Sequence, residues 1–188
     1  MLNPYLGPDG SITTEAIIFA YRIFLLLALP VCLWAAISDL RTMKIPNKTV
    51  YTLLAVFAVG GIMVIPLEFW LWRWLSFIVV FAITFGLYLV ARLGAGDAKF
   101  AAAAAPFVSQ NLAELQLVLI LLAFFMLAAL GLHRIARAIP AIRRATPDWA
   151  SWTSAGFPLG TALAATLMTY LAFKAFPSFY SLFAGIFA

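Results

Sequence analysis

Two aspartates in this sequence have the type and position to do chemistry. The chain of 188 residues holds only seven acidic residues. Asp39 follows a long apolar run, and Asp97 begins a shorter one. The other five acids fall in polar connections or near the opposite ends of such runs: Asp9, Glu15, Glu68, Glu114 and Asp148. An ionisable side chain at the edge of an apolar segment is costly to place, so it is a functional hypothesis by default.

If the two carboxyl groups meet in a poorly hydrated pocket, they cannot both ionise, and they share one proton. One can then take a proton from water while the other donates a proton to a carbonyl group, as in aspartic proteases. This chemistry needs no cofactor. The simpler interpretation is that each aspartate caps a helix or pairs with a nearby cation, Asp39 with Arg41 and Asp97 with Lys99.

The glycines beside the second aspartate favour the functional interpretation. Gly94 and Gly96 both precede Asp97 within three residues. Glycine permits unusual backbone angles and the close approach of another chain, so a substrate backbone could reach the acid. Glycines also serve helix packing, so this pattern alone is a weak signal.

Residues that other kinds of catalysis need are scarce. Cys32 is the only cysteine and His133 the only histidine. A zinc-protease helix needs two histidines and a carboxylate, so neither a metal site nor a disulfide framework is expected. The sequence has no Gly-x-Ser-x-Gly elbow and no Gly-x-x-x-x-Gly-Lys loop, so no nucleotide partner is expected. The net charge of +5 comes from a few connections, which indicates membrane orientation rather than nucleic-acid binding.

Composition predicts the elements that must position the aspartates. Hydrophobic residues make up 65% of the chain and charged residues 10%, whereas a soluble domain carries about 25% charged residues. We therefore expect an all-α, polytopic membrane protein with about six transmembrane helices. The expected spans are residues 16–38, 50–66, 75–91, 101–111, 112–132 and 156–176, of which the fourth is short enough to re-enter rather than cross.

We expect a single integral membrane domain over residues 1–188, with a polar N-terminal segment at 1–15 and cytoplasmic connections at 39–49 and 133–150. One side of the six spans would hold nine of the twelve basic residues: Arg41, Lys44, Lys48, Arg92, Lys99, Arg134, Arg137, Arg143 and Arg144. The other side would hold Arg73 and Lys174, with Arg22 near it. The positive-inside rule then puts both aspartates at the cytoplasmic face and both termini outside.

Three short sequence patterns predict local structural features. Residues 66–74 are rich in aromatic side chains and are expected to lie at the membrane interface. Gly60-Gly61 is expected to be a close-packing or kink point. Pro46-Asn47 is expected to shape the turn that enters the second span.

Three motifs resemble those of the type IV prepilin leader peptidases. Asp39-Leu40-Arg41 with Ile45-Pro46-Asn47 is similar to the first aspartate motif of that family. Gly94-Ala95-Gly96-Asp97-Ala98-Lys99 resembles its Gly-x-Gly-Asp-x-Lys motif, an element that also occurs in presenilin and the signal peptide peptidases. Phe157-Pro158-Leu159-Gly160 resembles its C-terminal Pro-x-Gly segment. The order and membrane depth of the motifs agree from about Val31 to the end of the sixth span.

The resemblance implies a membrane-embedded aspartic endopeptidase of the bacterial inner membrane, with Asp39 and Asp97 as the catalytic pair and no cofactor. Family substrates are prepilins, which carry a short basic leader before a hydrophobic helix. The implied partners are therefore a prepilin and membrane lipids, with the cut made at the cytoplasmic face.

The sequence also departs from the family pattern. Large members carry an N-terminal cytoplasmic insertion with paired cysteines, and many methylate the new N-terminus. This chain has neither feature and resembles the short form associated with tight-adherence, or Flp-type, pili, so N-methyltransferase activity is not expected. Ala98 stands where the family often has a larger aliphatic residue, and Leu159 replaces a common aromatic residue.

Two alternatives remain open. In a transporter, the two acids would form a proton or cation path, which predicts acids near the membrane midplane and usually broken helices or repeats. An inactive pilus assembly protein would keep the topology and lose an acid. For Lys99, contact with a lipid phosphate is favoured over an effect on the pKa of Asp97. Arg41, with Lys44 and Lys48, is expected to set the orientation rather than to contact substrate.

Overall fold

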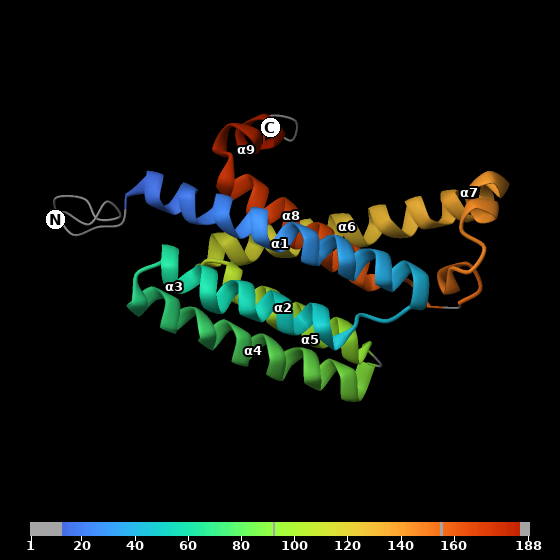
Figure 1. Ribbon diagram of the computed structural model, residues 1–188, viewed down its shortest axis with the longest axis horizontal. Coiled ribbons are helices and arrows are strands. Elements are labelled where there is room, and N and C mark those ends of the chain that lie inside the picture. Colours follow the sequence, from blue (N-terminus) through green and yellow to red (C-terminus); the bar gives the residue numbers. More distant parts are fainter. Residues whose placement is uncertain (1–12, 92, 155, 185–188) are drawn as a thin grey trace.

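The computed structural model describes residues 13–91, 93–154 and 156–184, and every regular element among them is a helix. The long helices are α1 (Thr14–Thr42), α4 (Leu67–Ala91), α6 (Leu112–Ala138) and α8 (Leu159–Ala175). A continuous rod between α1 and α4 consists of α2 (Asn47–Ala55), a π-helical turn (Val56–Gly60) and α3 (Gly61–Val64). The shorter elements are α5 (Ala95–Ala104), the 3-10 turn η2 (Ala105–Phe107), α7 (Pro140–Ala145), the 3-10 turn η3 (Ala150–Trp152) and α9 (Pro177–Ala184). The expected all-helical fold is confirmed (Figure 1).

Within the described residues, four helical segments are long and apolar enough to cross a membrane: α1, the α2–α3 rod, α4 and α6. A perpendicular span needs about 20 residues. The other two expected spans are shorter, because α5 has 10 residues and α8 has 17. The chain is therefore a multi-pass membrane protein, and four of its six expected spans have spanning length.

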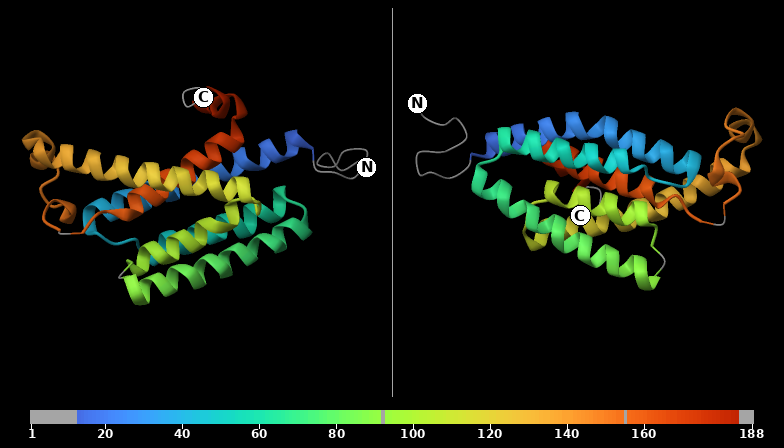
Figure 2. Two further views of the ribbon diagram at one scale, coloured as in Figure 1. Left: turned by 180° about the vertical axis from the view of Figure 1, so that it is seen from behind. Right: turned by 60° about the horizontal axis from the view of Figure 1, so that its bottom comes forward.

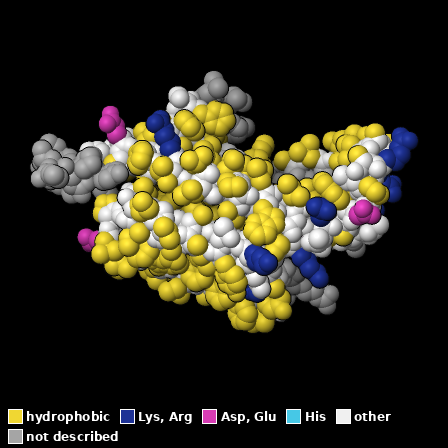
Figure 3. Space-filling model, in the orientation of Figure 1, with side chains coloured by type: hydrophobic (Ala, Val, Ile, Leu, Met, Phe, Trp, Pro, Cys, Tyr) yellow, Lys and Arg dark blue, Asp and Glu magenta, His cyan; other side chains and the backbone are white. Residues whose placement is uncertain are grey.

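The helices pack side by side in the order α6, α8, α1, α2, α5 and α4, and α5 also touches α8. The two flanking helices are the most exposed. Among the described residues, α4 contributes none to the buried core and α6 contributes only Leu121. Hydrophobic side chains cover most of the face shown in Figure 3, while Lys and Arg gather toward one end. This pattern suits a bundle whose sides face lipid.

An aromatic cluster holds the middle of the bundle together. The rings of Phe24, Phe57 and Phe107 lie 5.1–5.8 Å apart between centroids, and all three side chains are fully buried. Trp70 stacks on Phe57, and its indole N–H donates a hydrogen bond to the Phe57 carbonyl. A Cβ on Gly61 would lie 2.6 Å from Cδ1 of Trp70, so the expected close packing at Gly60-Gly61 is confirmed. The cluster fixes η2, and with it the direction of α5.

Several helices extend beyond the spans expected from hydropathy. α1 runs on from residue 38 to Thr42, α6 runs on from residue 132 to Ala138, and α5 begins at Ala95 rather than at 101. Most of the aromatic segment 66–74 forms the start of α4, and its expected place at the membrane interface stays a prediction. Hydropathy marks the part of a helix that can lie in lipid, whereas backbone hydrogen bonding continues into polar residues until a cap ends it.

At one end of the bundle, α6 reaches past α4 and α5 and leads into α7 (Figure 2). Four arginines are exposed on this extension: Arg134, Arg137, Arg143 and Arg144. The chain then returns through η3, where the Trp152 ring stacks on His133 with their centroids 5.2 Å apart. η3 contacts α1, so the extension lies at the end where α1 finishes and α8 begins.

Candidate active site

Asp39 lies in the last turn of α1, and its side chain is 4% exposed. The helix ends at Met43, which adopts the left-handed conformation (φ 54°) and donates its N–H to the Asp39 carbonyl. The hydroxyls of Ser38 and Thr42 both donate to the Lys44 carbonyl, at 3.1 and 3.3 Å. These hydrogen bonds close a tight turn after the helix, and the next residue lies inside the bundle.

That next residue, Ile45, is 7% exposed and lies between two other helices. A Cβ on Gly96 of α5 would lie 3.2 Å from the Ile45 Cβ and 3.3 Å from its backbone N and O. A Cβ on Gly160 of α8 would lie 2.7 Å from the Ile45 Cδ1. Because both residues are glycines, the N-terminal ends of α5 and α8 can pack directly against Ile45. The three motifs identified in the sequence therefore meet at this residue.

The start of α8 borders the Asp39 carboxylate. The backbone N–H of Thr161 donates to Asp39 Oδ2 at 3.3 Å. A Cβ on Gly160 would lie 2.9 Å from the same oxygen, so glycine leaves the space that the carboxylate occupies. The N-terminus of a helix favours negative charge. This placement therefore sets the Asp39 carboxylate against the N-terminus of α8.

Asp97 lies in the first turn of α5, outside the four helices of spanning length, and its side chain is half-buried. A Cβ on Gly94 would collide with the Asp97 carboxylate, so this glycine is required by space rather than by backbone angle. Burial, and then the charge of the Asp39 carboxylate, raise the pKa of Asp97 to about 7. Asp97 is therefore partly protonated near neutral pH.

A model described as the type IV leader peptidase family matches residues 25–132, a stretch that contains both aspartate motifs. The chain belongs to the type IV leader peptidase family. It is accordingly a peptidase, and the resemblance inferred from the motifs is confirmed. The Pro158–Gly160 segment lies outside the matched stretch. No curated protein and no solved structure matches the chain significantly.

The neighbouring cations do not pair with the two aspartates. The ion pair found among the described residues joins Lys174 to Glu114, far from this end of the bundle. Lys99 donates from Nζ to Asn47 Oδ1 at 3.2 Å, and Arg41 is exposed. Lys99 is exposed, so its expected contact with a lipid phosphate stays a prediction. Its side chain ties α5 to the start of α2, where Pro46 is the N-cap residue and shapes the turn as expected.

Sequence reasoning missed two residues of this site. Ile45 belongs to a quoted motif, but nothing in its type marks it as the contact between two helix starts. Thr161 follows Gly160 directly, yet its part in the site comes from a backbone N–H that every residue except proline has. Its side-chain oxygen is buried with no hydrogen-bond partner in the structure. The available signal was the place of Thr161 directly after the Pro-x-Gly motif.

Proposed function

We propose that the chain is an aspartic endopeptidase that removes the short basic leader of a prepilin-like substrate at the cytoplasmic face of the bacterial inner membrane, for type IV or Flp pilus biogenesis. The observation that carries the proposal is that Gly160, which borders the Asp39 carboxylate, and Gly96, which precedes Asp97, both pack against Ile45 at one end of an apolar bundle. A substrate helix lying in the bilayer would present its leader junction at the same depth. The proposed partners are that substrate and membrane lipids, and no cofactor is needed.

The proposed topology has six crossings with both chain ends outside. α5 with η2 forms the short fourth crossing, and α8 forms the sixth. Arg22 of α1 donates from Nε to the Ala175 carbonyl at the end of α8, which supports an even number of crossings because α1 begins where α8 ends. Four arginines exposed at the aspartate end support its placement in the cytoplasm.

The proposed mechanism gives the two aspartates different roles. Asp39, which accepts the Thr161 N–H, acts as the base and takes a proton from a water molecule as that water attacks the scissile carbonyl. Asp97 carries the shared proton and donates it to the carbonyl oxygen. When the tetrahedral intermediate collapses, the C–N bond breaks, the leaving amine takes the proton that Asp39 received from water, and a hydroxyl of the intermediate returns its proton to Asp97. The net reaction is hydrolysis, and the pair returns to its starting state.

The transporter alternative is disfavoured, because the family is one of peptidases and both acids lie at one end of the bundle. An inactive assembly protein is equally disfavoured, since both aspartates are present.

The test is co-expression with a candidate prepilin, with leader removal read as a mobility shift. Asp39→Asn and Asp97→Asn should each abolish processing while the protein still accumulates in the membrane. Asp148→Asn is the matched control, because Asp148 is an exposed acid in a connection, and it should cleave normally. Normal processing by either active-site variant would overturn the assignment. Purified enzyme should also remain active in chelator.

A further inference from the structure

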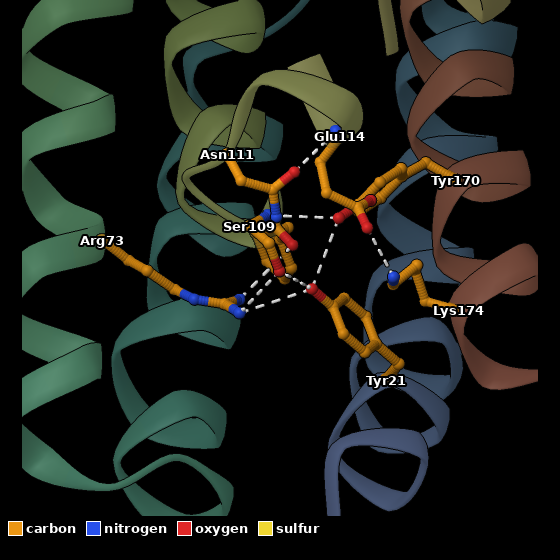
Figure 4. Close-up of polar contacts among 8 residues, drawn as sticks. Tyr21, Arg73, Ser109, Asn111, Glu114, Tyr170 and Lys174 are labelled. Atoms are coloured by element: carbon orange, nitrogen blue, oxygen red, sulfur yellow. Dashed lines mark hydrogen bonds and ion pairs between the residues drawn. The ribbon is translucent and has the colours of Figure 1, made fainter. Parts of the chain in front are cut away.

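A recess of about 390 Å³ lies at the end of the bundle opposite the two aspartates. It is bounded by the start of α1, the turn between α3 and α4, and the turn between η2 and α6. Its polar residues include Tyr21, Arg73 and Ser109, and its apolar wall includes Phe69 and Trp72. Figure 4 shows the Arg73 guanidinium pointing across from α4 toward the Tyr21 and Ser109 hydroxyls.

The cluster around this recess carries one positive charge without a carboxylate partner. Lys174 is neutralised by Glu114, with their N and O atoms 2.6 Å apart. Arg73 donates from one nitrogen to Tyr21 Oη and Ser109 Oγ, at 3.3 and 3.2 Å. Its other terminal nitrogen reaches backbone carbonyls of η2 at 3.5 Å. Among the described residues, none of the acids forms an ion pair with this guanidinium.

The bonds that Arg73 makes are long for a charged donor. Charge-assisted hydrogen bonds to a carboxylate or phosphate are about 2.7–2.9 Å long, whereas all four bonds of Arg73 are at 3.2–3.5 Å and end on neutral oxygens. Ionisable side chains in membrane proteins pair with opposite charges or with backbone carbonyls, and an anion would be a stronger partner for Arg73 than the neutral oxygens that it reaches. The guanidinium is therefore placed and oriented for an anion that would occupy the recess.

The rim of the recess shows what kind of anion fits. Ile17, Phe69 and Trp72 line the recess and are 40%, 52% and 59% exposed, so its opening lies among side chains that face lipid. Arg73 stands in the aromatic segment at the start of α4, where the membrane interface is expected. The volume is within the range of about 300–1,000 Å³ that is typical of ligand sites.

We propose that this recess binds the anionic headgroup of a membrane phospholipid, in the leaflet opposite the one that holds the aspartates. The phosphate contacts the Arg73 guanidinium and the Ser109 hydroxyl, and the acyl chains follow Phe69 and Trp72. A bound lipid would brace the turn between η2 and α6. Ser109 in this turn donates its backbone N–H to Tyr170 Oη at 3.1 Å, and Gln110 donates to the Trp72 carbonyl at 2.7 Å.

The test uses the full chain in detergent, stripped of lipid. Phosphatidylglycerol, phosphatidylcholine with the same acyl chains, and inorganic phosphate are added separately. Thermal stability is followed, and bound lipid is counted by native mass spectrometry. We expect saturable stabilisation and one retained lipid with phosphatidylglycerol only. Arg73→Gln should weaken the apparent affinity about tenfold. Arg22→Gln is the matched control, because Arg22 lies at the same end and outside the recess, and it should bind normally.

If Arg73→Gln fails to fold, a second variant, Ala16→Leu, tests lipid binding in the recess independently. Ala16 lines the recess and is 6% exposed, so Ala16→Leu fills it without removing a hydrogen bond. This variant should fold and lose the retained lipid. Equal stabilisation by the two lipids, or unchanged lipid binding by Ala16→Leu, would overturn the proposal. Equal stabilisation by inorganic phosphate would show a small-anion site instead and would also overturn it.

Discussion

Gly94 and Gly160 each leave the space that a neighbouring carboxylate fills, Gly94 beside Asp97 and Gly160 beside Asp39. Neither glycine is explained by a left-handed backbone, since Gly94 has φ −60° and Gly160 lies within α8. Both positions need a small residue because a helix begins there directly beside an aspartate side chain. At the scale of single residues, the site is therefore sensitive to one added methyl group.

Gly160→Ala should lower leader cleavage about tenfold or more, because its Cβ would lie 2.9 Å from Asp39 Oδ2 and 2.7 Å from the Ile45 Cδ1. Cleavage rate and thermal stability are measured together. Gly131→Ala is the control, since a Cβ there meets nothing within 4 Å. Equal cleavage by the two variants would contradict this account of Gly160.

The pH dependence of cleavage should report the shared proton. Asp97 must be protonated to act as the acid, and its pKa is raised from 3.8 to about 7. A group with a raised pKa keeps its proton up to that pH and loses it above. Cleavage should therefore be retained at weakly acidic pH and fall as the pH rises through about 7. A rate that climbs steadily to pH 9 would rule out Asp97 as the acid.

At the scale of elements, the site is a junction of three helix ends. α1 ends at it and α5 and α8 begin at it, with Ile45 between them. The Lys99–Asn47 hydrogen bond adds the start of α2. Because two helix N-termini converge there, backbone dipoles favour negative charge at the proposed active site.

Ile45→Ala should destabilise the fold by about 2–5 kcal/mol, the usual effect of removing a large aliphatic side chain from a packed site. Cleavage should fall with it, because α5 and α8 lose the residue against which both pack. Ile62→Ala is the comparison, since Ile62 is 54% exposed on the rod and should change stability by about 0.5 kcal/mol or less. Denaturation in detergent and the cleavage assay measure both effects.

At the scale of the whole molecule, the exposed apolar faces of α4 and α6 and the contact between the start of α1 and the end of α8 suit a bundle that crosses the membrane repeatedly. The three basic residues that the orientation rule leaves on the far side all have structural partners. Arg22 and Arg73 donate to carbonyls at the ends of helices, and Lys174 pairs with Glu114. Their position on the far side is therefore explained by these tertiary contacts, although the positive-inside rule disfavours basic residues there.

The topology predicts the outcome of reporter fusions. Alkaline phosphatase, which is active only outside the cytoplasm, should be active when fused after Gln110 and inactive when fused after Met43 or Arg144. The reason is that Gln110 lies at the end opposite the aspartates, and the other two positions lie at the aspartate end. The reverse pattern would place the aspartates outside and contradict the proposed function.

Much of this protein could be predicted from local patterns. Hydropathy indicated helices at the right places, and the scarcity of acids singled out Asp39 and Asp97. The motifs indicated the family that the match to residues 25–132 then confirmed. These features can be recognised without a structure because they depend on composition and on spacings of a few residues.

Only the tertiary structure decided how the parts meet. Thr161 and Asp39 are 122 residues apart in sequence, and Tyr21 and Ser109 are 88 apart. No local pattern encodes such contacts, since they arise from the packing of whole helices. The use of Gly160 as space for a carboxylate, and the unpaired charge of Arg73 in its recess, follow from that packing. The sequence alone determined which residues could be catalytic. The packing of the helices decided which other residues surround them.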